Sequence, residues 1–160
     1  MKKYIGLSLL VLWGLVTLSI VASADVRLPA IVGDHMILQQ QTGAPVWGWA
    51  DPGETVTVEG NWGKKATATT AENGKWKVFL KTPSHGGPHN LKINGKNEIT
   101  INNVVIGEVW LCAGQSNMGW RLSAVFEGAE DVASANYPNF RIFRSKRKHS
   151  HEPQEDCIAK

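Results

Sequence analysis

Short runs of alternating polar and apolar residues, separated by tight-turn residues, fill most of the stretch between residues 44 and 102. These runs lie at 44–50, 54–59, 65–70, 75–80, 90–94 and 98–102. Alternation with a period of two residues is typical of strands that bury one face. No part of residues 25–102 shows the apolar spacing of a long amphipathic helix. The pattern therefore predicts an antiparallel β-sandwich.

Two turn signals separate these runs. Asp51-Pro52-Gly53 follows the first run, and there proline pre-sets a turn angle while glycine accepts a positive φ. Asn73-Gly74 lies between the runs at 65–70 and 75–80. Since Asn-Gly is a strong hairpin signal, we predict a β-hairpin that joins these two strands.

The pattern changes near residue 104. Residues 104–106 and 109–113 form a nearly continuous apolar stretch, interrupted by Gly107-Glu108. A strand without alternation is apolar on both faces, as in a parallel sheet covered by helices. An α/β domain is therefore expected to begin here. Its expected elements are these strands, a helix capped by Ser116 or Asn117, a helical piece at 129–135 and a short strand at 140–143.

The start of the chain has the features of a secretory signal peptide. A basic start, Met1-Lys2-Lys3, precedes an apolar run over 4–22, and Ala22-Ser23-Ala24 matches a small-residue cleavage site. The alternative is an uncleaved anchor, because about 20 apolar residues suffice to span a bilayer. We expect cleavage, a secreted or periplasmic location, and no membrane contact in the mature chain.

The predicted organisation has three parts. They are a signal peptide over 1–24, an antiparallel β-sandwich domain over 25–103 and an α/β domain over 104–160. A doubly wound domain usually needs well over about 100 residues to cover both faces of its sheet. The last part is therefore expected to be incomplete.

Charge argues against a nucleic-acid partner. Without Lys2 and Lys3, the 17 basic side chains fall to 15, against 14 acidic ones, and the formal net charge falls from +3 to +1. A nucleic-acid-binding domain is typically far more basic. A local basic cluster is expected to be a solvated loop; it comprises Arg141, Arg144, Lys146, Arg147, Lys148 and His149.

The cysteines do not suggest a disulfide framework. Two of them, Cys112 and Cys157, are too few for one, although export would permit a single bridge. Cys112 lies inside the apolar run at 109–113, which predicts a buried free thiol.

A candidate nucleophile follows this apolar run directly. In open α/β sheets, ligands bind beyond the carboxyl ends of the strands, which is where Gly114-Gln115-Ser116-Asn117 would lie. Gly114 would let the backbone turn tightly, and Ser116 would offer its hydroxyl as a nucleophile and its own N–H as an oxyanion donor. The alternative is that Ser116 is only a helix N-cap.

The run from Val105 to Met118, VIGEVWLCAGQSNM, resembles the signature of the sialate O-acetylesterase family, which are carbohydrate acetylesterases of the SGNH hydrolase group. Weaker similarity extends over 28–29, 34–39, 46–50, 52–54 and 153–157. The resemblance implies a flavodoxin-like SGNH hydrolase domain after the sandwich, and an O-acetylated carbohydrate as substrate. Ser116 would be the nucleophile, and Gly114, Gln115 and Asn117 would position it. No cofactor or metal is expected, and the sequence assigns neither the sugar nor an oligomeric state.

The general base of such enzymes is missing from this sequence. SGNH hydrolases commonly supply it from an Asp-x-x-His pair, and no Asp here is followed by His at the third position. His149 and His151 are the only histidines after Ser116, and His-x-His alone is a weak sign of a metal or catalytic site. His35 is expected to make a structural hydrogen bond. The chain is therefore predicted to be inactive or incomplete as an esterase.

An alternative is a secreted carbohydrate-binding β-sandwich module without catalysis. Its indole rings would come from Trp47, Trp49, Trp62 and Trp76. Core packing is the plainer interpretation of Trp47 and Trp49, because they alternate with small residues along one strand.

Overall fold

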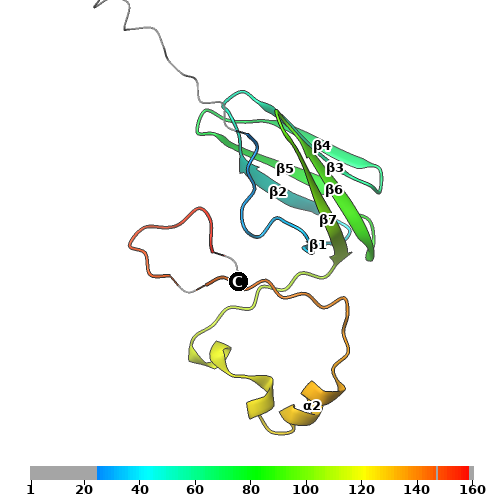
Figure 1. Cartoon of the computed structure of the whole chain (residues 1–160), viewed down its shortest axis with the longest axis vertical. Helices are drawn as coiled ribbons and strands as arrows, with labels where there is room; N and C mark the ends of the chain where they lie inside the picture. The colour runs from blue at the N-terminus through cyan, green and yellow to red at the C-terminus, as the bar shows by residue number, and fades with distance from the viewer. Residues whose placement is uncertain (1–24, 147, 159–160) are drawn as a thin grey trace, which may run out of the picture.

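Residues 25–146 and 148–158 are described by the computed structural model of the chain. The expected signal peptide and Arg147 lie outside the described residues. The described part consists mostly of β-strands, followed by a stretch with few helices (Figure 1). The strands are β1 Ile37–Gln39, β2 Gly43–Trp49, β3 Thr55–Gly60, β4 Lys64–Thr69, β5 Lys75–Lys81, β6 Gly86–Asn94 and β7 Glu98–Gly107. The strands predicted from alternation are confirmed, and the short β1 was missed.

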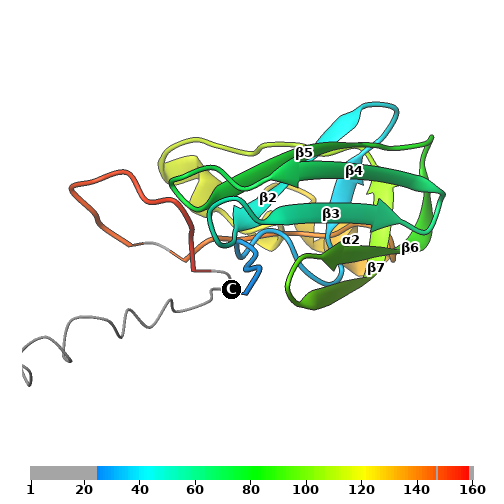
Figure 2. The same ribbon diagram turned by 90° about the horizontal axis from the view of Figure 1, so that it is seen from above.

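The strands form two sheets. One has five strands in the order β1-β7-β6-β3-β4, and the other pairs β2 with β5. Neighbouring strands are antiparallel except β1 and β7, which run parallel with Ile37 opposite Val105. Seen from above, β5 lies beside β4, so that the strands together form one curled layer (Figure 2).

The core lies on the concave side of these strands and follows the alternation in the sequence. In β3 the side chains of Val56 and Val58 are fully buried, and in β6 those of Leu91 and Ile93 are. The buried residues of both sheets form a single apolar cluster. Burial of each such side chain stabilises the fold by about 1.5–3 kcal/mol.

The turn at Asn73-Gly74 forms, but the hairpin predicted around it does not. Gly74 has a φ of +74°, and its amide donates to the carbonyl oxygen of Ala71 at 2.9 Å. However, β4 pairs with β3, whereas β5 pairs with β2. Turn residues fix the local path of the chain; the pairing follows from burial of the apolar face of β5 against the shared core. The turn at Asp51-Pro52-Gly53 is confirmed, with Gly53 at φ +79°.

Residues 104–106 do not start a new sheet but complete β7. Along this strand, buried side chains stand at Ile101 and then at Val104 and Ile106, so the alternation shifts by one residue. Asn103, with a φ of +55°, lies at the shift. An extra residue in a strand moves every later side chain to the opposite face. The apolar stretch at 104–106 is therefore a half-buried strand whose phase has changed.

The predicted strands at 109–113 and 140–143 are not formed. Trp110 is 82% exposed and Leu111 is 93% exposed. The helix expected from Ser116 consists of two 3₁₀ turns, η1 Ser116–Gly119 and η2 Leu122–Ala124, and the second helical piece forms as α2 Gly128–Ser134. Without an apolar surface to pack on, a short amphipathic helix gains little stability. This stretch descends from the end of β7 and returns towards the sheets (Figure 1).

Polar contacts tie the returning chain to the strand region, among them an ion pair between Glu155 and Lys75 of β5. The guanidinium of Arg141 donates to the carbonyl oxygens of Met36, at 3.2 Å, and Asn103, and to the Asn103 side chain at 2.8 Å. The Asp156 carboxylate accepts a hydrogen bond from the Ala30 amide at 3.0 Å. Within the described residues, no helix is both long and apolar enough to cross a membrane.

Candidate functional site

Ser116 is the first residue of η1 and is exposed. The turn is closed by the Met118 amide, which donates to the carbonyl oxygen of Gln115 at 3.1 Å. The Trp120 amide likewise donates to that of Asn117 at 3.2 Å. Within residues 25–146 and 148–158, the Ser116 hydroxyl makes no hydrogen bond with a side chain.

The alternative that Ser116 is a helix N-cap is wrong. The capping position is taken by Gln115, and no side-chain oxygen accepts a hydrogen bond from the first amides of η1. The Ser116 hydroxyl is therefore not used to stabilise the helix end. Because the first amides of a helical turn have no intrahelical partner, the Ser116 N–H is also suited to donate a hydrogen bond to an oxyanion.

The three expected positioning residues surround Ser116 along the chain. A Cβ on Gly114 would lie 2.8 Å from Cγ of Met118, so glycine lets the backbone approach this side chain closely. Gln115 precedes η1, and Asn117 lines a shallow hollow of about 300 Å³ together with Trp120 and Val125. The residue that follows Ser116 thus lines an open hollow.

Among the described residues, none is placed as a general base for Ser116. His149 and His151 are exposed, and neither bonds Ser116. His35 makes the structural hydrogen bond that was predicted, because its Nδ1 atom lies 2.7 Å from the side-chain amide nitrogen of Asn103. In the part of the chain that the structure describes, no three His, Cys, Asp or Glu residues cluster as metal ligands would.

A polar cluster at the end of β7 anchors the start of the signature run, and sequence reasoning missed it. The Val109 amide donates to Oε1 of Gln39 at 2.9 Å. The Gln39 and Gln40 amides donate to the Glu108 carboxylate at 2.9 and 2.7 Å. These hydrogen bonds, that of Gln40 first, hold the pKa of Glu108 below its ordinary value. The sequence signal that could have revealed this cluster is the family-like segment at 34–39, which ends with Gln39.

The prediction of a buried thiol at Cys112 is wrong. Cys112 and Cys157 are both exposed and both free thiols. Cys112 is exposed because the segment at 109–113 is not a strand within a covered sheet. Among the described members of the basic cluster, Arg144, Lys146, Lys148 and His149 are exposed as expected, whereas Arg141 is partly buried by its bonds to Met36 and Asn103.

The four tryptophans of the strand region fall into two groups. Trp76 is buried at 3% exposure. The Trp62 indole donates to the carbonyl oxygen of Lys81 at 2.9 Å, and its ring meets His89 edge to face. These two rings are structural. Trp47 and Trp49 are only partly buried and lie on the outer face of β2, so the prediction that both pack in the core holds only in part.

The strand region and the Ser116 turn together match a known class of protein. No family model matches the chain. It is similar to the crystal structure of a carbohydrate acetylesterase from Xanthomonas citri, with a TM-score of 0.74 and 35% identity over 85% of this chain and 32% of that one. The fold is thus that of part of a carbohydrate acetylesterase.

Curated relatives narrow this class. The chain is 32% identical to the sialate O-acetylesterase of Homo sapiens and 33% identical to that of Mus musculus, over 86% and 84% of its own length. The resemblance to the sialate O-acetylesterase family is confirmed, and the chain is a homologue of these ester hydrolases along most of its length. It spans 29% and 27% of the two relatives.

Proposed function

We propose that this chain is part of an exported carbohydrate O-acetylesterase in which Ser116 is the nucleophile. The observation that carries the proposal is an exposed serine, not used as a helix cap, within the signature run of a chain related to sialate O-acetylesterases. On this proposal, the strand region is an antiparallel β-sandwich. The stretch after it is the opening part of an SGNH-type α/β hydrolase domain.

The proposed reaction is the transfer of an acetyl group from a sugar hydroxyl to Ser116 and then to water. The Ser116 oxygen attacks the acetyl carbonyl while a base removes the hydroxyl proton. The Ser116 N–H and further donors stabilise the negative oxygen of the tetrahedral intermediate. The C–O bond to the sugar breaks, the sugar oxygen takes up the proton, and water then hydrolyses the acetyl-enzyme to acetate.

The base and the remaining oxyanion donors are proposed to come from a further part of the enzyme. This part corresponds to the portion of the relatives that the present chain does not span. The exposed apolar side chains after Glu108 support this, because an enzyme normally buries such groups. They include Trp110, Leu111, Trp120, Phe126, Tyr137 and Phe140. Without a base, a serine hydroxyl stays protonated and reacts slowly. The chain alone is expected to lose a factor of about 10⁴–10⁶ in kcat.

The test compares the mature chain with the same chain joined to the remaining part of the Xanthomonas citri acetylesterase. Acetate release from an O-acetylated sugar and from an aryl acetate is measured for both. We expect turnover from the joined protein, loss of that turnover in Ser116→Ala, and no effect of Ser123→Ala, a control at an exposed serine in η2. Unchanged turnover in Ser116→Ala would refute the assignment.

The alternative function, a carbohydrate-binding module without catalysis, is favoured by the outward position of Trp47 and Trp49. It predicts glycan binding by the mature chain, with no acetate release from the joined protein. Acetate release that depends on Ser116 would exclude it as the sole function.

A further inference from the structure

Two neighbouring glutamines at the end of β1 hold the chain where it leaves β7. β1 runs parallel to β7 with Gln39 opposite Gly107, so both strands end at the same edge of the sheet. The backbone amide of Gln40 donates to the carbonyl oxygen of Gly107 at 2.9 Å. The next residue, Glu108, therefore leaves the sheet directly beside the side chains of Gln39 and Gln40.

Each glutamine side chain uses both ends of its amide group. The nitrogens donate to the two oxygens of the Glu108 carboxylate, from Gln39 at 2.9 Å and from Gln40 at 2.7 Å. The Gln39 oxygen accepts a hydrogen bond from the backbone amide of Val109 at 2.9 Å. The Gln40 oxygen accepts one from the backbone amide of His85, also at 2.9 Å. Because donors and acceptors are all engaged, the orientation of each side chain in this polar cluster is fixed.

The chain after Val109 lacks such support until the Ser116 turn. Within the described part of the chain, residues 110–114 make no backbone hydrogen bond, and all of them are exposed. The next hydrogen bond that joins a described residue after Ser116 to the strand region comes from Arg141. The polar cluster is therefore the nearest fixed point before Ser116, and it ties the segment of the candidate nucleophile to the strands.

We propose that Gln39 and Glu108 are positioning residues for Ser116, because they fix the direction in which the signature run leaves the strands. The inference rests on the proposed esterase function and gives the strand region a part in the reaction. The attacking oxygen must lie about 3–3.5 Å from the acetyl carbon, and a displacement of about 1 Å can lower the rate about a hundredfold. Each extended residue spans about 3.3 Å, so a change of direction at Val109 grows along the chain before it reaches Ser116.

The first test measures kcat and KM of the joined protein for an O-acetylated sugar. Gln39→Ala removes the hydrogen bonds to Glu108 and from Val109. We expect kcat to fall about tenfold to a hundredfold, while KM stays within about twofold, because only the geometry of attack is disturbed. Gln40→Ala keeps the bond between Gln39 and Val109 and should lower kcat less.

An exchange of the two side chains tests the hydrogen bonds themselves. Gln39→Glu alone places two carboxylates side by side, and Glu108→Gln alone leaves one oxygen for two glutamine donors. The double variant Gln39→Glu/Glu108→Gln restores every bond, because the carboxylate at position 39 accepts from Val109 and from the new amide at position 108. We expect kcat of the double variant within about threefold of the unchanged joined protein, and kcat of each single variant about tenfold lower. A role in folding alone would change stability and leave kcat of the folded protein unchanged.

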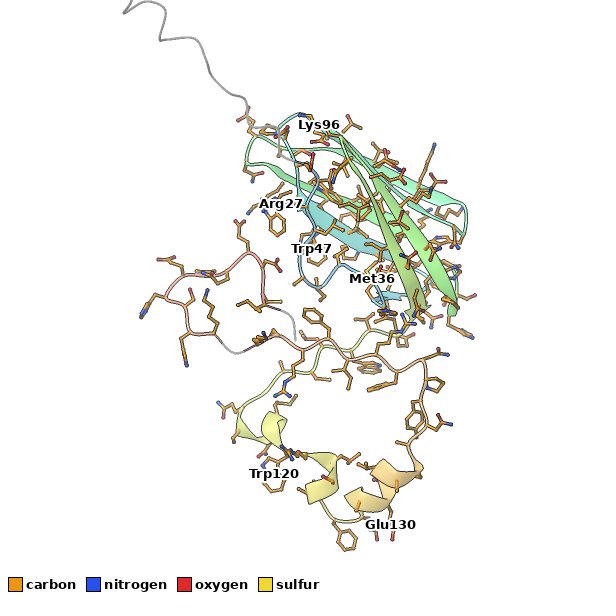
Figure 3. The ribbon with its side chains drawn as sticks, in the orientation of Figure 1. Arg27, Met36, Trp47, Lys96, Trp120 and Glu130 are labelled. Atoms are coloured by element: carbon orange, nitrogen blue, oxygen red, sulfur yellow. The ribbon has the colours of Figure 1, made fainter. Side chains whose placement is uncertain are left out.

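Asn97→Ala is the matched control. The Asn97 side chain also forms a long-range bridge, since it binds the backbone amide of Val26 at 2.8 Å and its carbonyl oxygen at 3.2 Å. Lys96, the neighbour of Asn97, and Met36, the residue before β1, lie at opposite ends of the sheets (Figure 3). Asn97→Ala should therefore leave kcat and KM of the joined protein unchanged. Circular dichroism verifies that each variant is folded.

A second measurement uses the mature chain and needs no turnover. Amide order parameters from ¹⁵N relaxation report the motion of residues 109–116. Gln39→Ala should lower them, the double variant should restore them, and Asn97→Ala should leave them unchanged. Unchanged order parameters in Gln39→Ala would overturn the inference.

In an active joined protein, unchanged kcat in Gln39→Ala, or a double variant no faster than the single ones, would also overturn it. Absence of turnover in the unchanged joined protein counts against the esterase proposal, and the order parameters then decide the inference about the polar cluster. The two failures are thus distinguishable.

Discussion

The strands up to Gly107 and the stretch after Glu108 differ in the burial of their apolar side chains. In the strand region, Val58 and Leu91 are fully buried. After Glu108, Leu111 is 93% exposed and Phe126 is 89% exposed. The strands supply one another with partners, whereas the later stretch contacts the sheets mainly through polar bonds such as those of Arg141. Both regions contain apolar residues, but a core forms only where the fold packs one apolar face of the strands against another.

The largest difference between the two regions should appear in stability. Leu91→Ala removes a fully buried side chain and is expected to lower the free energy of unfolding by about 2–5 kcal/mol. Leu111→Ala, at an exposed position, should change it by less than about 0.5 kcal/mol. Urea denaturation of both variants, monitored by tryptophan fluorescence, measures this difference. A cost at Leu111 comparable to that at Leu91 would show that the stretch after Glu108 has a core of its own.

A smaller effect is expected where the two regions are joined. Arg141→Ala removes the hydrogen bonds to Met36 and Asn103, and its loss should loosen the attachment of the later stretch without unfolding the strands. Amide hydrogen exchange in residues 109–146 should accelerate, while exchange in β3 and β6 should stay unchanged. Arg144→Ala, at an exposed member of the same cluster, is the control and should change neither. Faster exchange throughout the strands would mean that Arg141 supports the core itself.

The smallest effect is an acid-dependent loosening of the junction. The pKa of Glu108 is lowered in the folded chain by hydrogen bonds from Gln40 and Gln39, from an ordinary value of 4.5. A carboxyl with a depressed pKa stabilises the fold above its unfolded pKa, and this stabilisation is lost as the pH falls through the folded pKa. Lowering the pH below 4.5 should therefore speed exchange of the Val109 amide.

Glu108→Gln is the matched variant for this experiment, because it keeps the size of the side chain but cannot titrate. It should remove the acid-dependent change at Val109 and leave the intrinsic pH dependence of exchange. An acid response that persists in Glu108→Gln would assign it to another group.

The sequence predicts what local patterns control. The alternation at Val56 and Val58 gave both the strand and its buried face. It failed at Asn103, where the residue with positive φ shifts the phase and makes Val104 to Ile106 look apolar on both faces. Periodicity cannot reveal such an irregularity, because the extra residue is recognised only from the pairing with neighbouring strands.

The candidate site shows the same limit. Ser116 was found because its neighbours along the chain form the signature run. Gln39, which holds the Val109 amide, was missed because this contact joins residues 70 positions apart. Cys112 was placed in the core because burial was inferred from local composition, whereas burial depends on what packs against the segment.

Trapping the acyl-enzyme tests the role of Ser116 most directly. The joined protein is mixed with an O-acetylated sugar, quenched in acid and digested, and the peptides are analysed by mass spectrometry. The proposed mechanism predicts one acetyl group on the peptide that contains Ser116, and none in Ser116→Ala. An acetyl group trapped on a different residue would contradict it. So would turnover in Ser116→Ala equal to that of the unchanged joined protein, with no acetyl group found on Ser116.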